Sequence, residues 1–207
     1  MEFFVTATDT DAGKSVVSSI LVKSLLADYW KPIQSGDLHF SDTDRVRKWV
    51  NDGRCFFHPE SYRLETPCSP HHAAFLDNIS IELDHIQKPK KKSDHLIVEG
   101  AGGLMVPIND SELIIDMIEY LSIPVILVSK FYLGSINHTL LSIQALQKRD
   151  IPIYGVVYNG QMNPSSVDII TKMSGIHNHY HLPNVQSLNN EFIVKHAREI
   201  SKFLNIS

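Results

Sequence analysis

The sequence is poor in cysteine, in net charge and in long hydrophobic runs. Its 207 residues include two cysteines, Cys55 and Cys68, whose spacing fits neither a metal site nor a disulfide framework. We therefore expect reduced thiols in a cytoplasmic protein. The net charge of −4 argues against a protein that coats nucleic acid. The longest aliphatic run, residues 123–128, is far too short to cross a membrane, and the apolar start is too short for a signal peptide.

What remains is the composition of an ordinary globular protein, with 43% hydrophobic and 20% charged residues. A chain of this length can bury one sizeable sheet. We find no internal repeat and no low-complexity segment in it. The sequence therefore predicts a single domain over residues 1–207.

Apolar strand patterns alternate with helical patterns along the chain. Strands are predicted at 3–5, 29–33, 95–99, 124–128 and 153–158. Helices are predicted at 16–26, 41–50, 72–76, 81–86, 113–118, 136–146, from 164 onward and at about 191–204, and residues 55–70 are expected to be irregular. This alternation predicts an α/β fold with a mostly parallel sheet and helices on both faces. Ligands in such folds collect at the carboxyl ends of the strands.

The first loop carries the clearest motif. Residues 7–15 read Ala-Thr-Asp-Thr-Asp-Ala-Gly-Lys-Ser and lie between the first predicted strand and the first predicted helix. In such a loop, backbone N–H groups converge on phosphates at a helix N-terminus, where the helix dipole favours negative charge. Lys14 can then reach the outer phosphates, and the Ser15 hydroxyl can bind Mg²⁺. The sequence therefore predicts a phosphate loop, although the regular pattern has glycine where this chain has Thr8.

Carboxylates placed near strand ends provide candidate ligands for Mg²⁺. This ion prefers oxygen and usually takes one or two carboxylates together with substrate phosphates. Glu99 ends the apolar strand at 95–99, and either Asp42 or Asp44 could supply a second carboxylate. Each aspartate could equally serve to cap its helix.

A second lysine and a pair of glycines fall at the same predicted edge of the sheet. Lys31 follows the second strand and brings another positive charge toward Lys14, an arrangement that suits phosphoryl transfer. Gly102 and Gly103 would allow the backbone to approach a ligand closely.

Two further patterns favour ordinary structural roles. His177, His179 and His181 would share one face of a strand, but no fourth ligand for a zinc ion is evident nearby. The basic run at 88–92 is short and lies in a negatively charged chain, so we interpret it as a solvated connector.

Several motifs, in this order, resemble the dethiobiotin synthetase family, and together they cover most of the chain. They are the phosphate loop at 4–15, Lys-Pro-Ile-Gln-Ser-Gly at 31–36, Ser-Asp at 41–42, Thr-Pro-Cys-Ser-Pro-His at 66–71, Val-Glu-Gly-Ala-Gly-Gly at 98–103 and Leu-Gly-Ser-Ile-Asn-His at 133–138.

The resemblance implies an ATP- and Mg²⁺-dependent ring closure in biotin biosynthesis. Diaminopelargonic acid takes up CO₂ on one amine as a carbamate, and ATP phosphorylates the carbamate. The second amine then attacks the mixed anhydride, which gives dethiobiotin, ADP and phosphate. The resemblance also implies a homodimer, because in this family the site for the substrate carboxylate is completed across a two-fold axis. From the net charge and the short apolar runs we expect no nucleic-acid partner and no membrane.

The resemblance also assigns roles by position. The catalytic residues would be Lys14 and Lys31, which stabilise charge on the transferring groups, and Thr10 and Ser35, which position the carbamate or phosphate. The residues around Mg²⁺ would be Ser15, Asp42 and Glu99. The nucleotide would bind Asp11, Ala12, Gly13, Lys14, Ser15, Val16, Glu99 and Gly102, with Asn159 and Pro183 at the adenine. The substrate would bind Ser35, and its distal carboxylate would bind Gly134 and Asn137 at a helix N-terminus.

The chain departs from the family pattern at a few positions. Ala7 replaces the first glycine of the loop, which could reshape the loop or weaken nucleotide binding. Asp11 stands where relatives often carry Glu. Helix register favours Asp42 over Asp44 as the metal ligand, because it places Val46 on the apolar face.

Two other functions fit parts of the sequence. A switch ATPase of the Min or plasmid-partitioning type would carry a second lysine early in the phosphate loop, and residues 7–12 contain none. A catalytically dead nucleotide-binding protein would be consistent with Ala7. The presence of Lys14, Ser15, Lys31 and Glu99 favours an enzyme.

Overall fold

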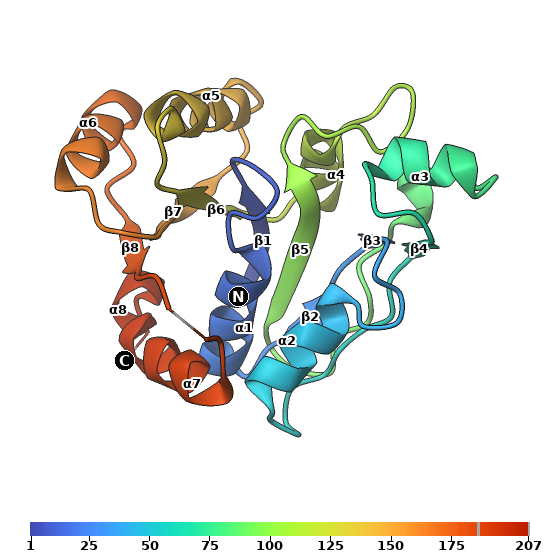
Figure 1. The fold of residues 1–207 in the computed structure, drawn as a ribbon, viewed down its shortest axis with the longest axis horizontal. Coiled ribbons are helices and arrows are strands. Elements are labelled where there is room, and N and C mark those ends of the chain that lie inside the picture. Colours follow the sequence, from blue (N-terminus) through green and yellow to red (C-terminus); the bar gives the residue numbers. More distant parts are fainter. Residues whose placement is uncertain (186, 207) are drawn as a thin grey trace.

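A six-stranded sheet, parallel throughout, forms the centre of the computed structural model, which describes residues 1–185 and 187–206 (Figure 1). Its strands, in spatial order, are β2 (Asp28–Trp30), β5 (Leu96–Gly103), β1 (Glu2–Ala7), β6 (Val125–Lys130), β7 (Ile153–Asn159) and β8 (His179–Leu182). A separate parallel pair joins β3 (Ile33–Ser35) to β4 (Tyr62–Leu64). The predicted α/β class with a parallel sheet is confirmed.

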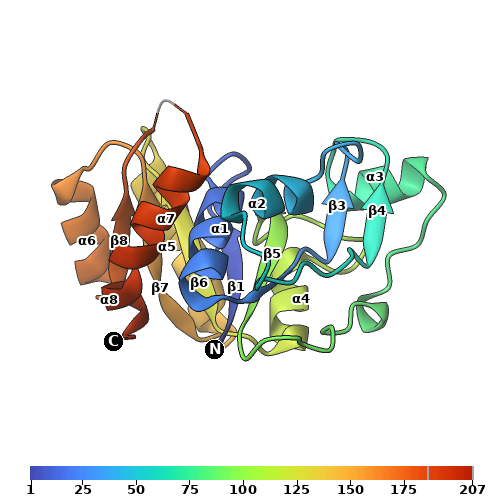
Figure 2. The ribbon, with the colours of Figure 1, turned by 90° about the horizontal axis from the view of Figure 1, so that it is seen from below.

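Helices cover both faces of the sheet (Figures 1 and 2). One face carries α1 (Lys14–Leu25), α2 (Asp42–Val50), α7 (Asn190–Glu199) and α8 (Ser201–Leu204). The other carries α4 (Ile114–Leu121), α5 (Ser135–Lys148) and α6 (Pro164–Ser174), while α3 (Pro70–Leu76) lies beside the β3–β4 pair. In the described residues, no helix is both long and apolar enough to cross a membrane.

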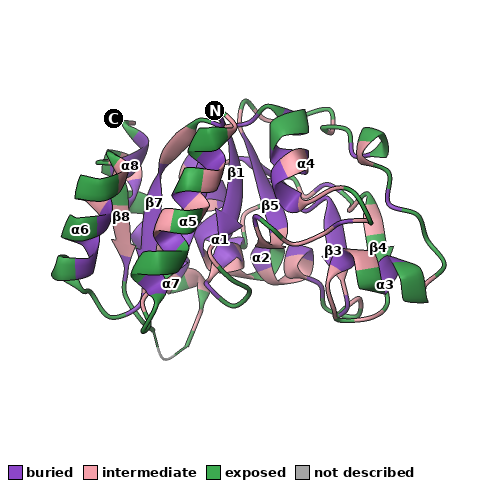
Figure 3. Ribbon diagram, turned by 90° about the horizontal axis from the view of Figure 1, so that it is seen from above, coloured by how far each residue is buried: buried purple, intermediate pink, exposed green. Residues whose placement is uncertain are grey.

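The inner strands β5, β1, β6 and β7 are largely buried on both sides, which explains their nearly continuous apolar sequences, whereas the edge strand β8 is only partly buried (Figure 3). In β1, Phe4 belongs to the core beneath α4 and α5, whereas Val5 belongs to the core beneath α1. Neighbouring strands repeat this alternation, with Val98 in the first core and Ile97 in the second. Because the two cores share one sheet, the strand ends that carry polar residues are held in fixed relative positions.

Several predicted elements were wrong in extent. The strand predicted at 29–33 is two strands, β2 and β3, because the chain leaves the central sheet at Lys31 and Pro32 and pairs instead with β4. That partner lies inside the segment predicted to be irregular. The helix predicted at 81–86 is a single 3₁₀ turn, Leu83–His85, and the last predicted helix is divided at Ile200 into α7 and α8.

The end of the chain supports α2. Asn190, the first residue of α7, donates from Nδ2 to the carbonyls of Trp49 at 2.8 Å and Val50 at 2.9 Å. Those two carbonyls belong to the last turn of α2, where no further helical N–H is present to satisfy them. This contact joins the C-terminal region to the helix that begins with Asp42.

We expect Gly155→Ala to destabilise the protein by about 2 kcal/mol, as overpacking of a tight core does. A Cβ at this position would lie 2.5 Å from the backbone oxygen of Asn178 and 2.6 Å from the Phe203 ring. Urea unfolding would measure the change. The control is Gly53→Ala, where a Cβ meets nothing within 4 Å and should change little. Equal stability of the two variants would contradict the packing described for β7.

Candidate active site

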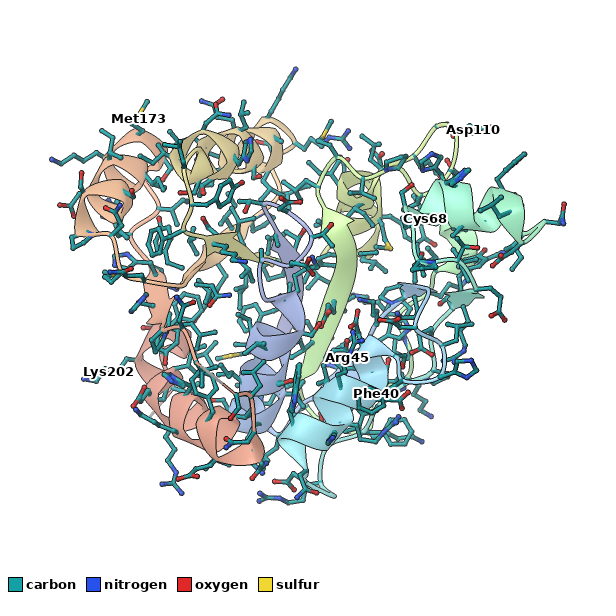
Figure 4. The ribbon with its side chains drawn as sticks, viewed as in Figure 1. Phe40, Arg45, Cys68, Asp110, Met173 and Lys202 are labelled. Atoms are coloured by element: carbon teal, nitrogen blue, oxygen red, sulfur yellow. The ribbon has the colours of Figure 1, made fainter. Side chains whose placement is uncertain are left out.

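A cleft of about 680 Å³ opens at the carboxyl edge of the central sheet. Its walls come from the phosphate loop, the segment after β3, helix α2, the segment before α3 and the end of β5. Arg45 on α2 and Cys68 before α3, which both line the cleft, are labelled in Figure 4. The predicted site residues that line it are Thr10, Asp11, Gly13, Lys14, Ser15, Val16, Lys31, Ser35, Asp42, Glu99 and Gly102.

The phosphate loop connects the end of β1 to the start of α1. Gly13 caps the helix with a left-handed backbone (φ 103°), and a Cβ there would lie 2.4 Å from the Asn159 side chain. Asn159 Nδ2 donates to the carbonyl of Ala12 at 2.8 Å. Lys14 folds back and donates to the carbonyl of Asp9 at 3.3 Å. The loop is thus held from β7, and its lysine side chain lies back against the loop.

Ala7 does not disturb this loop. It is the last residue of β1, is paired with Val128 and Gly103, and has none of the positive φ that would require glycine. Its side chain is fully buried in the core beneath α1 and does not line the cleft. The close approach is provided on the neighbouring strand, where a Cβ on Gly103 would lie 3.2 Å from the carbonyl oxygen of Ala7.

A buried network of charges forms the floor of the cleft. The Lys31 ammonium pairs with Asp42 Oδ2 and lies 3.4 Å from Glu99 Oε1. Glu99 is 1% exposed and also accepts hydrogen bonds from Ser15 Oγ at 2.7 Å and from the Tyr29 hydroxyl at 3.0 Å. Residues from α1, β2 and the segment after β2 therefore meet at this carboxylate of β5, and Lys31 links it to Asp42 on α2.

The pKa shifts in this network follow from burial and neighbouring charges. Burial lowers the pKa of Lys14 despite the attraction of Glu99. Burial alone would also lower the pKa of Lys31, but the Glu99 and Asp42 carboxylates outweigh it and the pKa is raised. Burial works to raise the pKa of Asp42, yet Lys31 and Arg45 hold it below its usual value. Lys31 is thus a firmly charged cation at neutral pH.

The structure separates the two candidate aspartates. Asp42 lines the cleft between Lys31 and Arg45, whose Nη1 lies 2.9 Å from Asp42 Oδ1. Asp44 instead completes a capping box with Ser41 and pairs with Arg47 at 2.7 Å, outside the cleft. Its role is to cap α2.

The donor set around Glu99 suits a hard cation. Ser15, Asp42 and Glu99 offer only oxygen atoms, as Mg²⁺ prefers, and two carboxylates leave coordination positions for phosphate and water. In the described part of the chain, this site included, no group of three or more His, Cys, Asp or Glu side chains gathers in a way that could hold a metal, so the serine hydroxyl would have to complete the set. His181 contacts the Gly160 carbonyl, and His179 packs against Tyr158.

Some predicted residues lie away from the cleft. Ala12 is buried beneath the loop, and Asn159 contacts the loop from the end of β7. Pro183 is exposed just after β8. Gly134 and Asn137 are exposed at the start of α5 and do not line the cleft. The predicted substrate-carboxylate site is therefore not joined to the cleft within the described chain.

Two residues in the network were missed from the sequence. Arg45 pairs with both Asp42 and Asp37, and its spacing of three residues from Asp42 on a helix is a signal that could have identified it. Tyr29 left no such signal, because a tyrosine in an apolar strand is usually a core residue. Burial and the Glu99 charge raise the pKa of Tyr29 well above its usual value, so its hydroxyl remains a donor.

Comparison with known proteins identifies the family. A family model described as an AAA domain matches residues 1–192. The chain is 43% identical to an ATP-dependent dethiobiotin synthetase BioD of Cytophaga hutchinsonii, over 95% of both chains. It is 47% identical to the protein of the same name from Christiangramia forsetii, over 84% of this chain and 83% of the relative. The chain belongs to the dethiobiotin synthetase family. The resemblance carried by the motifs is thereby confirmed.

Solved structures show how widely this fold is shared. A ParA family ATPase from Chlorobium tepidum matches with a TM-score of 0.57 at 14% identity, over 95% of this chain and 97% of that one. The cell-division ATPase MinD of Pyrococcus furiosus matches with a TM-score of 0.53 at 12% identity, over 97% of this chain and 98% of that one. Identities this low establish the fold alone, whereas the dethiobiotin synthetase relatives do not favour the switch-ATPase alternative.

We expect Gly13→Ala to weaken binding of a non-hydrolysable ATP analogue by at least about tenfold, because a Cβ strains a left-handed backbone and meets Asn159. Ala7→Gly should leave the affinity within about twofold while costing about 1 kcal/mol of stability, since it only removes a core methyl from a strand. Calorimetry on both variants would test this pair. A large gain in affinity for Ala7→Gly would contradict the loop geometry.

Proposed function

We propose that the protein is an ATP-dependent dethiobiotin synthetase that closes the ring of diaminopelargonic acid with CO₂. The observation that carries this proposal is the meeting of the phosphate loop, Lys31 and the carboxylates of Asp42 and Glu99 in one cleft, in a chain of this family. We also propose that residues 1–207 act as one domain in the cytoplasm, which the shared sheet and the two free thiols support.

The reaction needs positive charge held at fixed positions. One amine of the substrate adds to CO₂ and loses a proton, which forms a carbamate. A carbamate oxygen attacks the γ-phosphorus of ATP and ADP leaves. The second amine then attacks the carbamoyl carbon, and phosphate leaves as the ring closes. Negative charge grows on the transferring phosphoryl group, and Lys14 and Lys31 are placed to stabilise it.

The remaining groups in the cleft would bind and orient the reactants. Ser15, Asp42 and Glu99 would hold Mg²⁺, which neutralises phosphate charge when bound. Ser35 lines the cleft, and its buried hydroxyl has no hydrogen-bond partner among the described residues, which suits a contact with the carbamate. Thr10 of the phosphate loop also lines the cleft and would contact the same group. Asn159 and Pro183 would contact the adenine.

We further propose a homodimer formed through the surface around α5. Exposed apolar side chains surround the start of this helix, and exposed positions extend along its outer side (Figure 3). The exposed apolar side chains of this surface are Met105, Tyr132, Leu133, Ile136 and Leu141. A hollow of about 310 Å³ lies between Met105, Leu141 and the phosphate loop, beside this surface. A substrate carboxylate bound at Gly134 and Asn137 would therefore belong to a molecule in the partner's cleft.

We expect phosphate release from MgATP to require both diaminopelargonic acid and bicarbonate, with dethiobiotin identified by its mass. Lys14→Ala should abolish this turnover while the protein stays folded, because Lys14 acts on phosphate charge and is not part of the apolar core. Lys172→Ala on α6, outside the cleft, is the matched control. Release that ignores the diamine would instead indicate a switch ATPase.

We expect Leu141→Asp to convert the dimer to a monomer and to lower turnover, because it places a charge in an apolar contact surface. Leu141 is 55% exposed on α5, and Met173, 64% exposed on α6, offers the matched control Met173→Asp. Sedimentation would report the oligomeric state. A wild-type protein that is monomeric and fully active would rule out the shared site.

A further inference from the structure

The hydrogen bonds to Glu99 are divided between its two oxygens. Oε1 accepts from Ser15 Oγ at 2.7 Å and lies 3.4 Å from the Lys31 ammonium. Oε2 accepts from the Tyr29 hydroxyl at 3.0 Å. Ser15 and Lys31 line the cleft, whereas Tyr29 does not. One oxygen of this carboxylate therefore faces the reactants, and the other is directed into the protein.

Tyr29 is itself held rigidly. Tyr29 on β2 pairs with Ile97 on β5, and Glu99 follows Ile97 by two positions, on the same face of β5. On its other side, Tyr29 accepts a backbone hydrogen bond from His58 and donates one to Phe56. Its side chain is 0% exposed in the core beneath α1 and α2, and its ring packs against Phe57 with centroids 5.9 Å apart. The hydroxyl thus has a fixed position below Glu99.

The geometry points to Tyr29 as a positioning residue that fixes the orientation of the Glu99 carboxylate. By occupying Oε2, the phenol leaves Oε1 as the oxygen that faces Ser15 and the cleft. This inference rests on the proposed Mg²⁺–nucleotide site. Without the hydroxyl, a buried carboxylate oxygen would lose its donor, and the carboxylate would turn toward Lys31 to recover one.

The test is the Mg²⁺ dependence of nucleotide binding by Tyr29→Phe, which keeps the ring and removes only the donor. Titration calorimetry with a non-hydrolysable ATP analogue at a series of Mg²⁺ concentrations should show a Mg²⁺ requirement raised by about 10- to 100-fold, as loss of a partner behind a metal ligand typically does. Binding of metal-free ADP should stay within about twofold of wild type, because the phosphate loop is untouched. A general loss of packing would weaken both.

The matched control is Tyr180→Phe. This tyrosine also donates to a carboxylate, Glu199, at 3.4 Å, but it lies on β8 away from the cleft. The Mg²⁺ concentration that the Tyr180→Phe variant requires for nucleotide binding should equal that of the wild-type protein. An unchanged requirement in Tyr29→Phe, with a Mg²⁺-dependent wild type, would overturn the inference alone. A wild type whose nucleotide binding ignores Mg²⁺ would overturn the proposed metal site and the inference together.

A second measurement covers the case in which Tyr29→Phe fails to fold. A crystal structure of the wild-type protein with Mg²⁺ and the ATP analogue should keep the Tyr29 hydroxyl on Glu99 Oε2 while Oε1 faces the metal. A hydroxyl turned away from Glu99 in that structure would overturn the inference. Diamine-dependent phosphate release by the same preparation separates either result from a failure of the proposed reaction.

Discussion

The pairing of one buried carboxylate with one buried ammonium governs the architecture around the cleft. A charged Glu99 in the interior would be costly without partners, and so would a charged Lys31. The two opposite charges compensate each other. Ser15 and Tyr29 donate further hydrogen bonds to Glu99, and Asp42 forms a second ion pair with Lys31. Because these residues come from different elements, the charges are compensated only when the sheet, α1 and α2 are correctly assembled. The polar site thus specifies the same arrangement as the apolar core.

Much of this could be predicted from the sequence, because the informative features are local. The phosphate loop, the strand ending at Glu99 and the alternation of strands with helices each occupy a short stretch of chain. Parallel topology then brings the strand ends together. Most of the predicted site residues accordingly line one cleft. They are Thr10, Asp11, Gly13, Lys14, Ser15, Val16, Lys31, Ser35, Asp42, Glu99 and Gly102.

What could not be predicted depends on contacts distant in sequence. The split of β2 from β3 follows from the pairing of Gln34 with Arg63 in β4, which no local pattern announces. The role of Tyr29 depends on a neighbour 70 residues away. The sequence pattern predicts that Ala7 disturbs the loop, because glycine at that position suggests a special backbone conformation. The strand pairing instead shows an ordinary extended residue with its methyl group in the core. The β2–β3 split, the role of Tyr29 and the conformation of Ala7 all depend on contacts between residues far apart in the sequence, and local propensity does not reveal them.

The contact of Asn190 with the end of α2 has a consequence for synthesis of the protein. Its two hydrogen bonds span 140 and 141 residues, so they cannot form until the chain has been made as far as Asn190. Loops this long close late and make folding slow relative to proteins with local contacts. Helix α2 carries Asp42 at its other end. A ribosome-bound chain would therefore complete the support of α2, and with it the position of Asp42, only after α7 emerges.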